Sequence, residues 1–183
     1  LLFFPCLSCF SQGEWNQWRF GTFISLDYNS GSPVQVANNN MSTIRGTVSL
    51  SDSLGNLLLY SDGIAVWDRT NIVMPNGYGL HGYDTPIKPV FAFNIIDSTY
   101  YIFTVGTAAY LPPPTPTYYG LEYSIVDMRL HNGLGDIPTG LKNIPLNAAN
   151  KAYHYLCGTR HHNNRDVWVV VKQHPIMSDV WPY

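Results

Sequence analysis

The chain has 183 residues and a net charge of −2 at neutral pH, with 45% hydrophobic and only 12% charged residues. This composition excludes a disordered chain, because disorder goes with low hydrophobicity. It also excludes a strongly basic protein that would hold nucleic acid or anionic lipid electrostatically. Aromatic residues reach 14%, with thirteen tyrosines. Few charges with many Tyr, Thr, Asn and Gly are typical of extracellular β proteins.

Residues 1–12 are apolar, uncharged and too few to span a bilayer. They look like the end of a secretory signal peptide, with a hydrophobic core followed by a polar exit near Ser11–Gly13. Neither a basic segment nor an initiator Met precedes them, which predicts a chain truncated at its start. The alternative is an ordinary buried first strand. The mature chain, 13–183, is expected to be secreted or displayed at the cell surface.

The cysteines fit this interpretation. Cys6 and Cys9 would leave with the signal, so Cys157 is the single thiol of the mature chain. No internal disulfide is then expected, and the fold must be held by its core. The apolar neighbours of Cys157, among them Leu156 and Trp168, predict a buried and unreactive thiol.

Turn chemistry punctuates the chain about every eight to twelve residues. The turn segments are Asn29–Pro33, Ser51–Asn56, Pro75–Gly77, Asn132–Gly133 and Asn163–Asn164. Runs rich in aliphatic and aromatic residues lie between them: Gly46–Leu50, Leu57–Tyr60, Ile64–Trp67, Val90–Asn94, Tyr100–Val105, Leu121–Val126 and Val167–Lys172. Short strands at this spacing predict an all-β sandwich, barrel or propeller. Only Leu146–Leu156 is expected to take a turn or two of helix.

Internal similarity favours the propeller. One unit covers Val48–Asp68, a second covers Phe91–Val105 and continues through Leu121–Met128, and a third covers Leu156–Val171. In each unit a strand ends, a polar turn follows, and an aromatic and aliphatic strand returns. The sequence therefore predicts a partial β-propeller of about three antiparallel blades. The blades are placed near 18–68, 88–128 and 150–183, and a β-sandwich is the alternative.

Six residues carry the predicted structural motifs of the blades. They are Asp52 and Gly55 in one turn, Asp62 and Gly63 in the next, and Trp67 and Trp168 in strands. The aspartates can accept backbone N–H bonds, and the glycines can supply positive φ. The tryptophan rings are expected to fill the space between neighbouring blades.

These motifs and their order resemble the N-terminal propeller region of Bacteroidetes surface proteins, the large gliding-motility-associated and type IX-secreted proteins. The matching stretches are Trp18–Gly21, Leu26–Pro33, Ser51–Asp68, Val73–Gly77, Tyr100–Val105, Leu121–Met128, Gly133–Asp136 and Arg160–Val170. The resemblance implies a propeller at the cell surface, with no membrane span in the mature chain and with further domains downstream. It implies no particular activity or ligand.

No arrangement of catalytic, cofactor-binding or metal-binding residues is predicted. His161 and His162 are adjacent, so on one strand their side chains would point to opposite faces and not to one ion. In that turn a histidine can bond the backbone or stack on a tryptophan. Glu14 and Glu122 are the only glutamates, and nothing pairs them across a cleft as a glycosidase requires. The segment Asp52–Leu54 and the similar 97–99 resemble bacterial O-glycan acceptor sites. Their acceptor hydroxyls would be those of Ser53 and Ser98.

The predicted function is that of a non-catalytic recognition or scaffold propeller, which binds a protein or an extracellular polysaccharide and no nucleic acid. Two alternatives remain open. One is a carbohydrate-binding, lectin-like propeller, which exposed Trp or Tyr rings around the central channel would favour. The other is part of a polysaccharide-acting enzyme with its site outside this fragment, for which a facing pair of carboxylates would argue.

Overall fold

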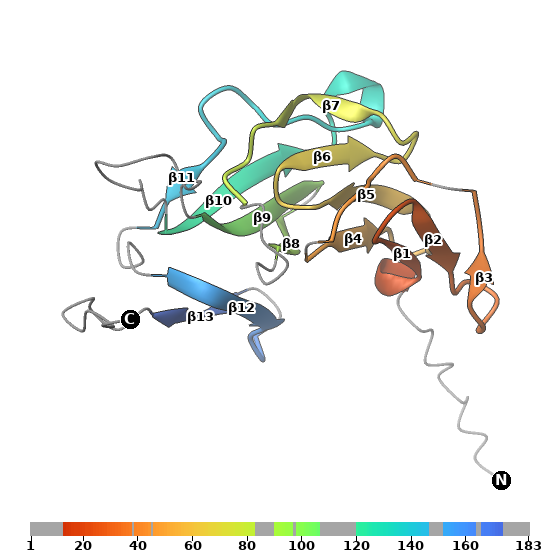
Figure 1. Cartoon of the computed structure of the whole chain (residues 1–183), viewed down its shortest axis with the longest axis horizontal. Helices are drawn as coiled ribbons and strands as arrows, with labels where there is room; N and C mark the ends of the chain where they lie inside the picture. The colour runs from red at the N-terminus through yellow and green to blue at the C-terminus, as the bar shows by residue number, and fades with distance from the viewer. Residues whose placement is uncertain are drawn as a thin grey trace, which may run out of the picture.

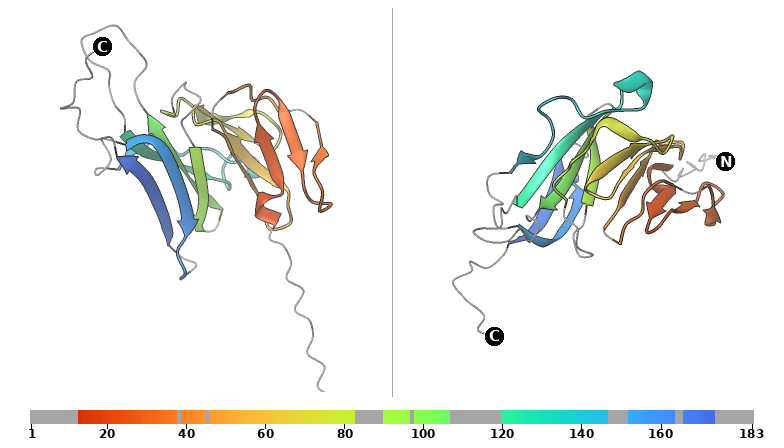
Figure 2. Two further views of the ribbon diagram at one scale, coloured as in Figure 1. Left: turned by 60° about the horizontal axis from the view of Figure 1, so that its bottom comes forward. Right: turned by 45° about the horizontal axis from the view of Figure 1, so that its top comes forward.

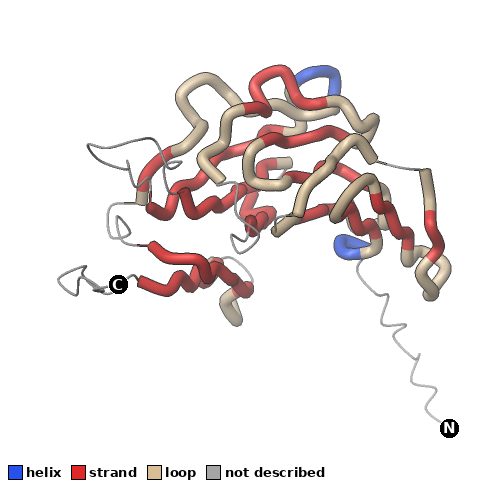
Figure 3. Tube along the Cα trace, in the orientation of Figure 1, coloured by secondary structure: helices blue, strands red, loops and turns tan. Residues whose placement is uncertain are grey.

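The computed structural model describes residues 13–37, 39–44, 46–82, 90–96, 98–106, 120–146, 152–163 and 166–173. Across these ranges the chain is all-β, as predicted. Its strands are joined by turns and accompanied by two short 3-10 helices, η1 (Gly13–Trp15) and η2 (His131–Gly133) (Figure 3). Neither of these described helices has the length and apolar character that a membrane crossing requires.

The strands of the described ranges form four antiparallel sheets, numbered here in chain order. Sheet 1 contains β1 (Gln17–Phe20), β2 (Ile24–Asp27) and β3 (Val34–Gln35). Sheet 2 contains β4 (Val48–Ser51), β5 (Leu57–Ser61), β6 (Ala65–Asp68) and β7 (Val73–Tyr78). Sheet 3 contains β8 (Val90–Ile96), β9 (Thr99–Gly106), β10 (Gly120–Asp127) and β11 (Ile144–Pro145), and sheet 4 contains β12 (Ala152–Arg160) and β13 (Val167–Gln173). Neighbours in each sheet are also neighbours in sequence, so sheets 1 to 3 are meanders and sheet 4 is a hairpin.

The sheets pack against one another in the order of the chain (Figures 1 and 2). Between sheets 2 and 3 lies a core that includes Leu59, Val66, Ile102 and Val126. The opposite face of sheet 3 packs on sheet 4 around Phe103 and its neighbours. The alternation of side chains along β9 and β10 thus gives sheet 3 two apolar faces. Sheet 2 carries a further apolar cluster on its other face, so both central sheets are buried on two sides. This cluster consists of Met41, Leu57, Tyr60, Ala65 and Trp67.

The first strands of the sheets lie close together. Strand β1 contacts β4, β4 contacts β8, and β8 contacts β12. Each of these strands starts its meander, so the meanders spread outward from neighbouring starting strands. No sheet in the described part of the chain closes on itself.

Each predicted strand run overlaps an observed strand, and the repeated units correspond to meanders. The unit Val48–Asp68 forms β4, β5 and β6, and the unit Leu156–Val171 lies in β12 and β13. The middle unit forms β8, β9 and β10. Residues 18–68, placed in one blade, are divided between sheets 1 and 2.

Two local predictions are wrong. The segment Pro75–Gly77 is part of β7 and not a turn. Proline lacks the N–H of a ladder bond, but β7 is the outer strand of sheet 2, where that loss is tolerated. The predicted helix Leu146–Leu156 is contradicted where the structure describes it, because 152–156 belong to β12 and pair with β13. Residues 147–151 lie outside the described residues.

The two tryptophans have different surroundings. Trp67 is buried, and its ring stacks on Tyr60 with 5.2 Å between centroids. Trp168 is 59% exposed on the last described sheet, so its packing between neighbouring blades stays a prediction. The predicted burial of Cys157 is wrong, because the residue is exposed. Leu156 faces the core, and successive residues of a strand point to opposite faces.

We expect Ile102→Ala to lower the free energy of unfolding by about 2–5 kcal/mol, because Ile102 is fully buried between sheets 2 and 3 and its removal leaves a cavity. Urea unfolding measures this loss. The control Ile72→Ala removes an exposed side chain and should change stability by no more than about 0.5 kcal/mol. Equal effects of the two variants would contradict the assignment of the core.

Candidate functional site

A cleft of about 270 Å³ opens near the ends of β4 and β8, beside η1. We call it the first-strand cleft. Its hydrogen-bonding wall consists of Glu14, Asp52, Ser53, Asn94, Ser98 and Tyr100, and its apolar lining includes Trp15, Leu50, Ala92 and Phe93. This combination of one large ring, an apolar lining and a few polar groups is typical of small-molecule sites.

A larger hollow of about 560 Å³ follows β1 and β4. In this hollow Arg19 Nη2 donates to Gln17 Oε1 at 3.1 Å and the Arg19 backbone N–H donates to Ser49 Oγ at 2.7 Å, but Arg19 Nε is buried without a hydrogen-bond partner. The remaining side chains of this hollow are mainly apolar. The smaller first-strand cleft presents two carboxyl groups and more hydroxyl groups, so it is the better candidate for a ligand rich in hydroxyl groups.

Close backbone packing fixes Trp15 at the cleft. The Gly13 N–H donates to the Ser53 carbonyl at 3.3 Å, and a Cβ at Gly13 would lie 2.4 Å from the Gly55 nitrogen. Only glycine therefore fits where η1 meets the β4–β5 turn. The Trp18 indole N–H donates to the Trp15 carbonyl at 2.8 Å and holds the other side of η1. Trp15 remains 51% exposed, and it lines both this cleft and the larger hollow.

The turn motifs have the predicted chemistry. Asp52 Oδ1 accepts two backbone N–H groups of its own turn, each at 2.9 Å, and Gly55 has a φ of +85°. In the next turn Asp62 Oδ1 also accepts two backbone N–H groups at 2.9 Å, and Gly63 has a φ of +83°. These hydrogen bonds fix the shape of two successive hairpins of sheet 2, and the first of them, with Asp52, borders the cleft.

The two predicted O-glycan acceptors, Ser53 and Ser98, line the same cleft and are exposed. Ser53 lies in the β4–β5 turn and Ser98 in the β8–β9 turn, so equivalent hairpins of successive sheets meet here. The structure thus brings Asp52 together with both serines. Residue 97 lies outside the described residues, and modification of the serines stays a prediction.

The cleft is acidic and has one phenolic donor. Burial acts to raise the pKa of Asp52, but hydrogen bonds from Asn56, Leu54 and Gly55 outweigh it and hold the pKa below its ordinary value. Asp52 is therefore ionised at neutral pH. Burial, with the charges of Glu14 and Asp52, raises the pKa of Tyr100, so its hydroxyl stays protonated. A ligand would meet carboxylate acceptors and a hydroxyl donor side by side.

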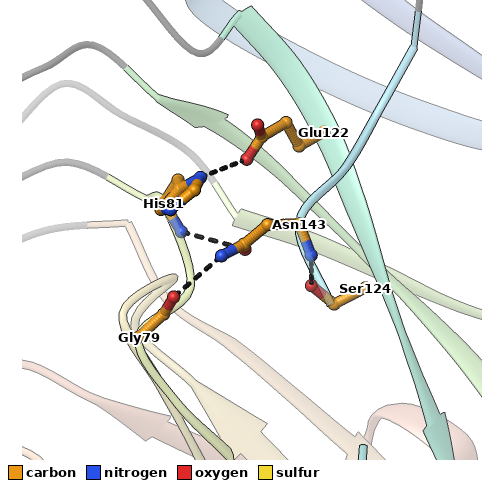
Figure 4. A network of polar contacts seen from close by, with 5 residues as sticks. All are labelled: Gly79, His81, Glu122, Ser124 and Asn143. Carbon is orange, nitrogen blue, oxygen red and sulfur yellow. Dashed lines mark hydrogen bonds and ion pairs between the residues drawn. The ribbon is translucent and has the colours of Figure 1, made fainter. Parts of the chain in front are cut away.

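A second polar cluster joins sheets 2 and 3 away from the cleft (Figure 4). Glu122 on β10 is only 5% exposed, and its Oε2 lies 2.8 Å from His81 Nδ1. The His81 backbone N–H donates to Asn143 Oδ1 at 3.2 Å, and Asn143 Nδ2 donates to the Gly79 carbonyl at 2.8 Å. The Asn143 N–H donates to Ser124 Oγ at 3.0 Å. These contacts tie the chain after β7 to β10.

The environment of Glu122 perturbs its ionisation. Burial raises the pKa of Glu122 above its ordinary value, while His81 opposes the shift through its charge and hydrogen bond. The sequence shows Glu122 as one of two glutamates, yet it gives no sign that His81, 41 residues earlier, is its partner. No motif links the two positions, so sequence reasoning missed the pair.

His161 makes a backbone contact and a ring contact. The Asn163 backbone N–H donates to His161 Nδ1 at 3.3 Å, which is one of the roles predicted for a histidine in this turn. The His161 ring lies 5.7 Å from that of Trp168, but the two rings are tilted by 47° and not stacked as predicted. In the part of the chain that the structure describes, no three His, Cys, Asp or Glu side chains gather where they could hold a metal ion.

No family model, curated protein or solved structure matches the chain.

We expect the stability of the wild-type chain to fall relative to Glu122→Gln as the pH rises from about 4 to 6. A carboxyl whose pKa is raised by folding stabilises the protein below its unfolded pKa and loses that contribution as the pH rises through the folded value. Glutamine does not titrate. Urea unfolding of both chains across this range measures the difference, and parallel pH curves would contradict the perturbed environment of Glu122.

Proposed function

We propose that the chain is a non-catalytic recognition module, built as successive blades of an incomplete β-propeller, which binds polysaccharide in the first-strand cleft. The observation that carries this proposal is Trp15, an exposed ring fixed beside a wall of hydrogen-bonding side chains. The export to a cell surface is supported by the sequence resemblance to Bacteroidetes surface proteins.

The stacking of the sheets supports a propeller more than a sandwich. In a two-layer sandwich each sheet buries one face, whereas sheets 2 and 3 each carry apolar clusters on both faces. Propeller blades are antiparallel meanders arranged around a central axis. The contacts of β1 with β4, β4 with β8 and β8 with β12 agree with first strands that lie nearest such an axis.

The first-strand cleft offers complementary chemistry for a sugar. A pyranose ring has an apolar C–H face, which can pack on an indole, and a rim of hydroxyl groups. Glu14 and Asp52 can accept hydrogen bonds from these hydroxyls, and Tyr100 can donate one. The cleft therefore offers an apolar surface and both kinds of hydrogen-bonding group at one place.

The same geometry favours binding over hydrolysis. Asp52 Oδ1 accepts two backbone N–H groups, and its Oδ2 accepts the Asn56 side-chain N–H at 2.9 Å. These bonds hold Asp52 as a structural element of the turn. Among the described residues that line the cleft, no second carboxylate then remains to act with Glu14, and a glycosidase needs two.

A glycan array probed with the full chain should identify a bound polysaccharide, and Trp15→Ala should raise the dissociation constant at least tenfold, which corresponds to about 1.4 kcal/mol. The loss is expected because the variant removes the ring that a sugar would contact. Isothermal titration calorimetry with the best array ligand measures it.

Tyr78→Ala is the matched control, because Tyr78 is an exposed aromatic residue on β7 that does not line the cleft. The affinity of this variant for the polysaccharide should equal that of the wild type. Incubation with the same polysaccharide should release no new reducing ends. Binding that is indifferent to Trp15→Ala, or an array without a bound glycan, would refute the proposed site; steady release of reducing ends would favour an enzyme.

A further inference from the structure

The outer face of sheet 1 is more apolar than its inner face. The inner face, toward sheet 2, is polar, with Gln17, Arg19 and Ser25 buried. The outer face carries two apolar cross-strand pairs, Trp18 with Leu26 and Phe20 with Ile24. Trp18 is 48% and Ile24 40% exposed. In a sheet with one solvent face the polar residues should face outward, so this reversal indicates that the outer face is built to be covered.

Sheet 4 has a similar face at the other end of the stack. Residues of β12 and β13 alternate, so that Leu156, Val169 and Val171 face sheet 3. The outer face carries two cross-strand pairs, Thr159 with Trp168 and Cys157 with Val170, and Val170 is 56% exposed. Figure 2 shows sheets 1 and 4 at opposite ends of the molecule.

The two end faces suit each other. All eight side chains of the four cross-strand pairs are uncharged, so bringing the pairs together would bury no charge from either set. Each face combines a tryptophan with aliphatic residues. The junction of sheets 3 and 4 has the same character, with aromatic and aliphatic side chains of one sheet on aliphatic side chains of the next. A face-to-face contact of sheet 1 with sheet 4 would repeat a junction that the chain already makes.

We propose that a second copy of this chain covers these faces, with the outer face of sheet 1 of each copy packed on the outer face of sheet 4 of its partner. Such head-to-tail contacts form a closed ring when the rotation closes. The described residues of one chain form four sheets, so two copies provide twice that number, which lies within the four to eight blades of known propellers. The closed ring rests on the propeller proposed above. Ile24 and Val170 do not line the first-strand cleft, so variants at these positions test dimer formation independently of ligand binding.

Size-exclusion chromatography with light scattering should give the mass of a dimer for the full chain at about 10–100 µM. At these concentrations a dimer with a dissociation constant of about 1 µM is the main species. Ile24→Arg on sheet 1 and Val170→Arg on sheet 4 should each weaken the dimer at least tenfold, because either charge would be buried in both copies of the interface. Ile72→Arg, an exposed position in the β6–β7 turn, is the control and should leave a dimer. Thermal melts of all three variants check that each remains folded.

Mixing the two variants tests the head-to-tail arrangement. Ile24→Arg keeps an intact sheet 4 face and Val170→Arg an intact sheet 1 face, so a mixture should form a heterodimer through one good interface. The rate of alkylation of Cys157, measured by mass spectrometry of the peptide that contains it, should be lower in the wild-type dimer than in Val170→Arg. The reason is that Cys157 lies beside Val170 on the face that the dimer covers. A wild-type monomer at 100 µM, a dimer broken by only one variant, or an open series of larger species would overturn the proposal.

Discussion

The arrangement of this chain depends on the two apolar faces of sheet 3. Ile102 and Val126 face one way and Phe103 and Leu121 the other, so the sheet must be covered twice before its surface is withdrawn from water. Sheet 2 covers one face and sheet 4 the other. The order of the layers then follows the order of the chain, because each meander is joined to the next. The first-strand cleft results from this packing, since it lies where equivalent hairpins of sheets 2 and 3 come side by side.

Local chemistry explains why much of the fold could be predicted. The hairpin around Asp52 and Gly55 depends on hydrogen bonds and a positive φ within a few residues, and both are readable from the sequence. Sheet 1 and β11 could not be predicted in this way, because their strands are short and lack long apolar runs. Pro75 was misleading, because only the position of β7 at the edge of its sheet makes a proline acceptable in a strand.

The candidate site depends on contacts that no local pattern contains. Trp15 and Tyr100 line one cleft although they are far apart in the sequence, and His81 meets Glu122 across two sheets. The exposure of Cys157, by contrast, could have been predicted. Its neighbour Leu156 faces the core, and the alternation of a strand then turns the thiol outward. In a strand, apolar neighbours in sequence do not indicate burial, because successive side chains point to opposite faces of the sheet.

The loop between β10 and β11 has a consequence for how the molecule opens. Asp136 accepts the Asn76 N–H at 2.8 Å, and Lys142 Nζ donates to Asn76 Oδ1 at 2.8 Å and to the Tyr78 carbonyl at 2.9 Å. Asn143 extends these links to the residues after β7. The outer strand of sheet 2 is thereby hydrogen-bonded to a loop of sheet 3, so neither sheet can separate without breaking these bonds as a group. Sheets 2 and 3 are therefore expected to open together in hydrogen exchange, as one cooperative unit.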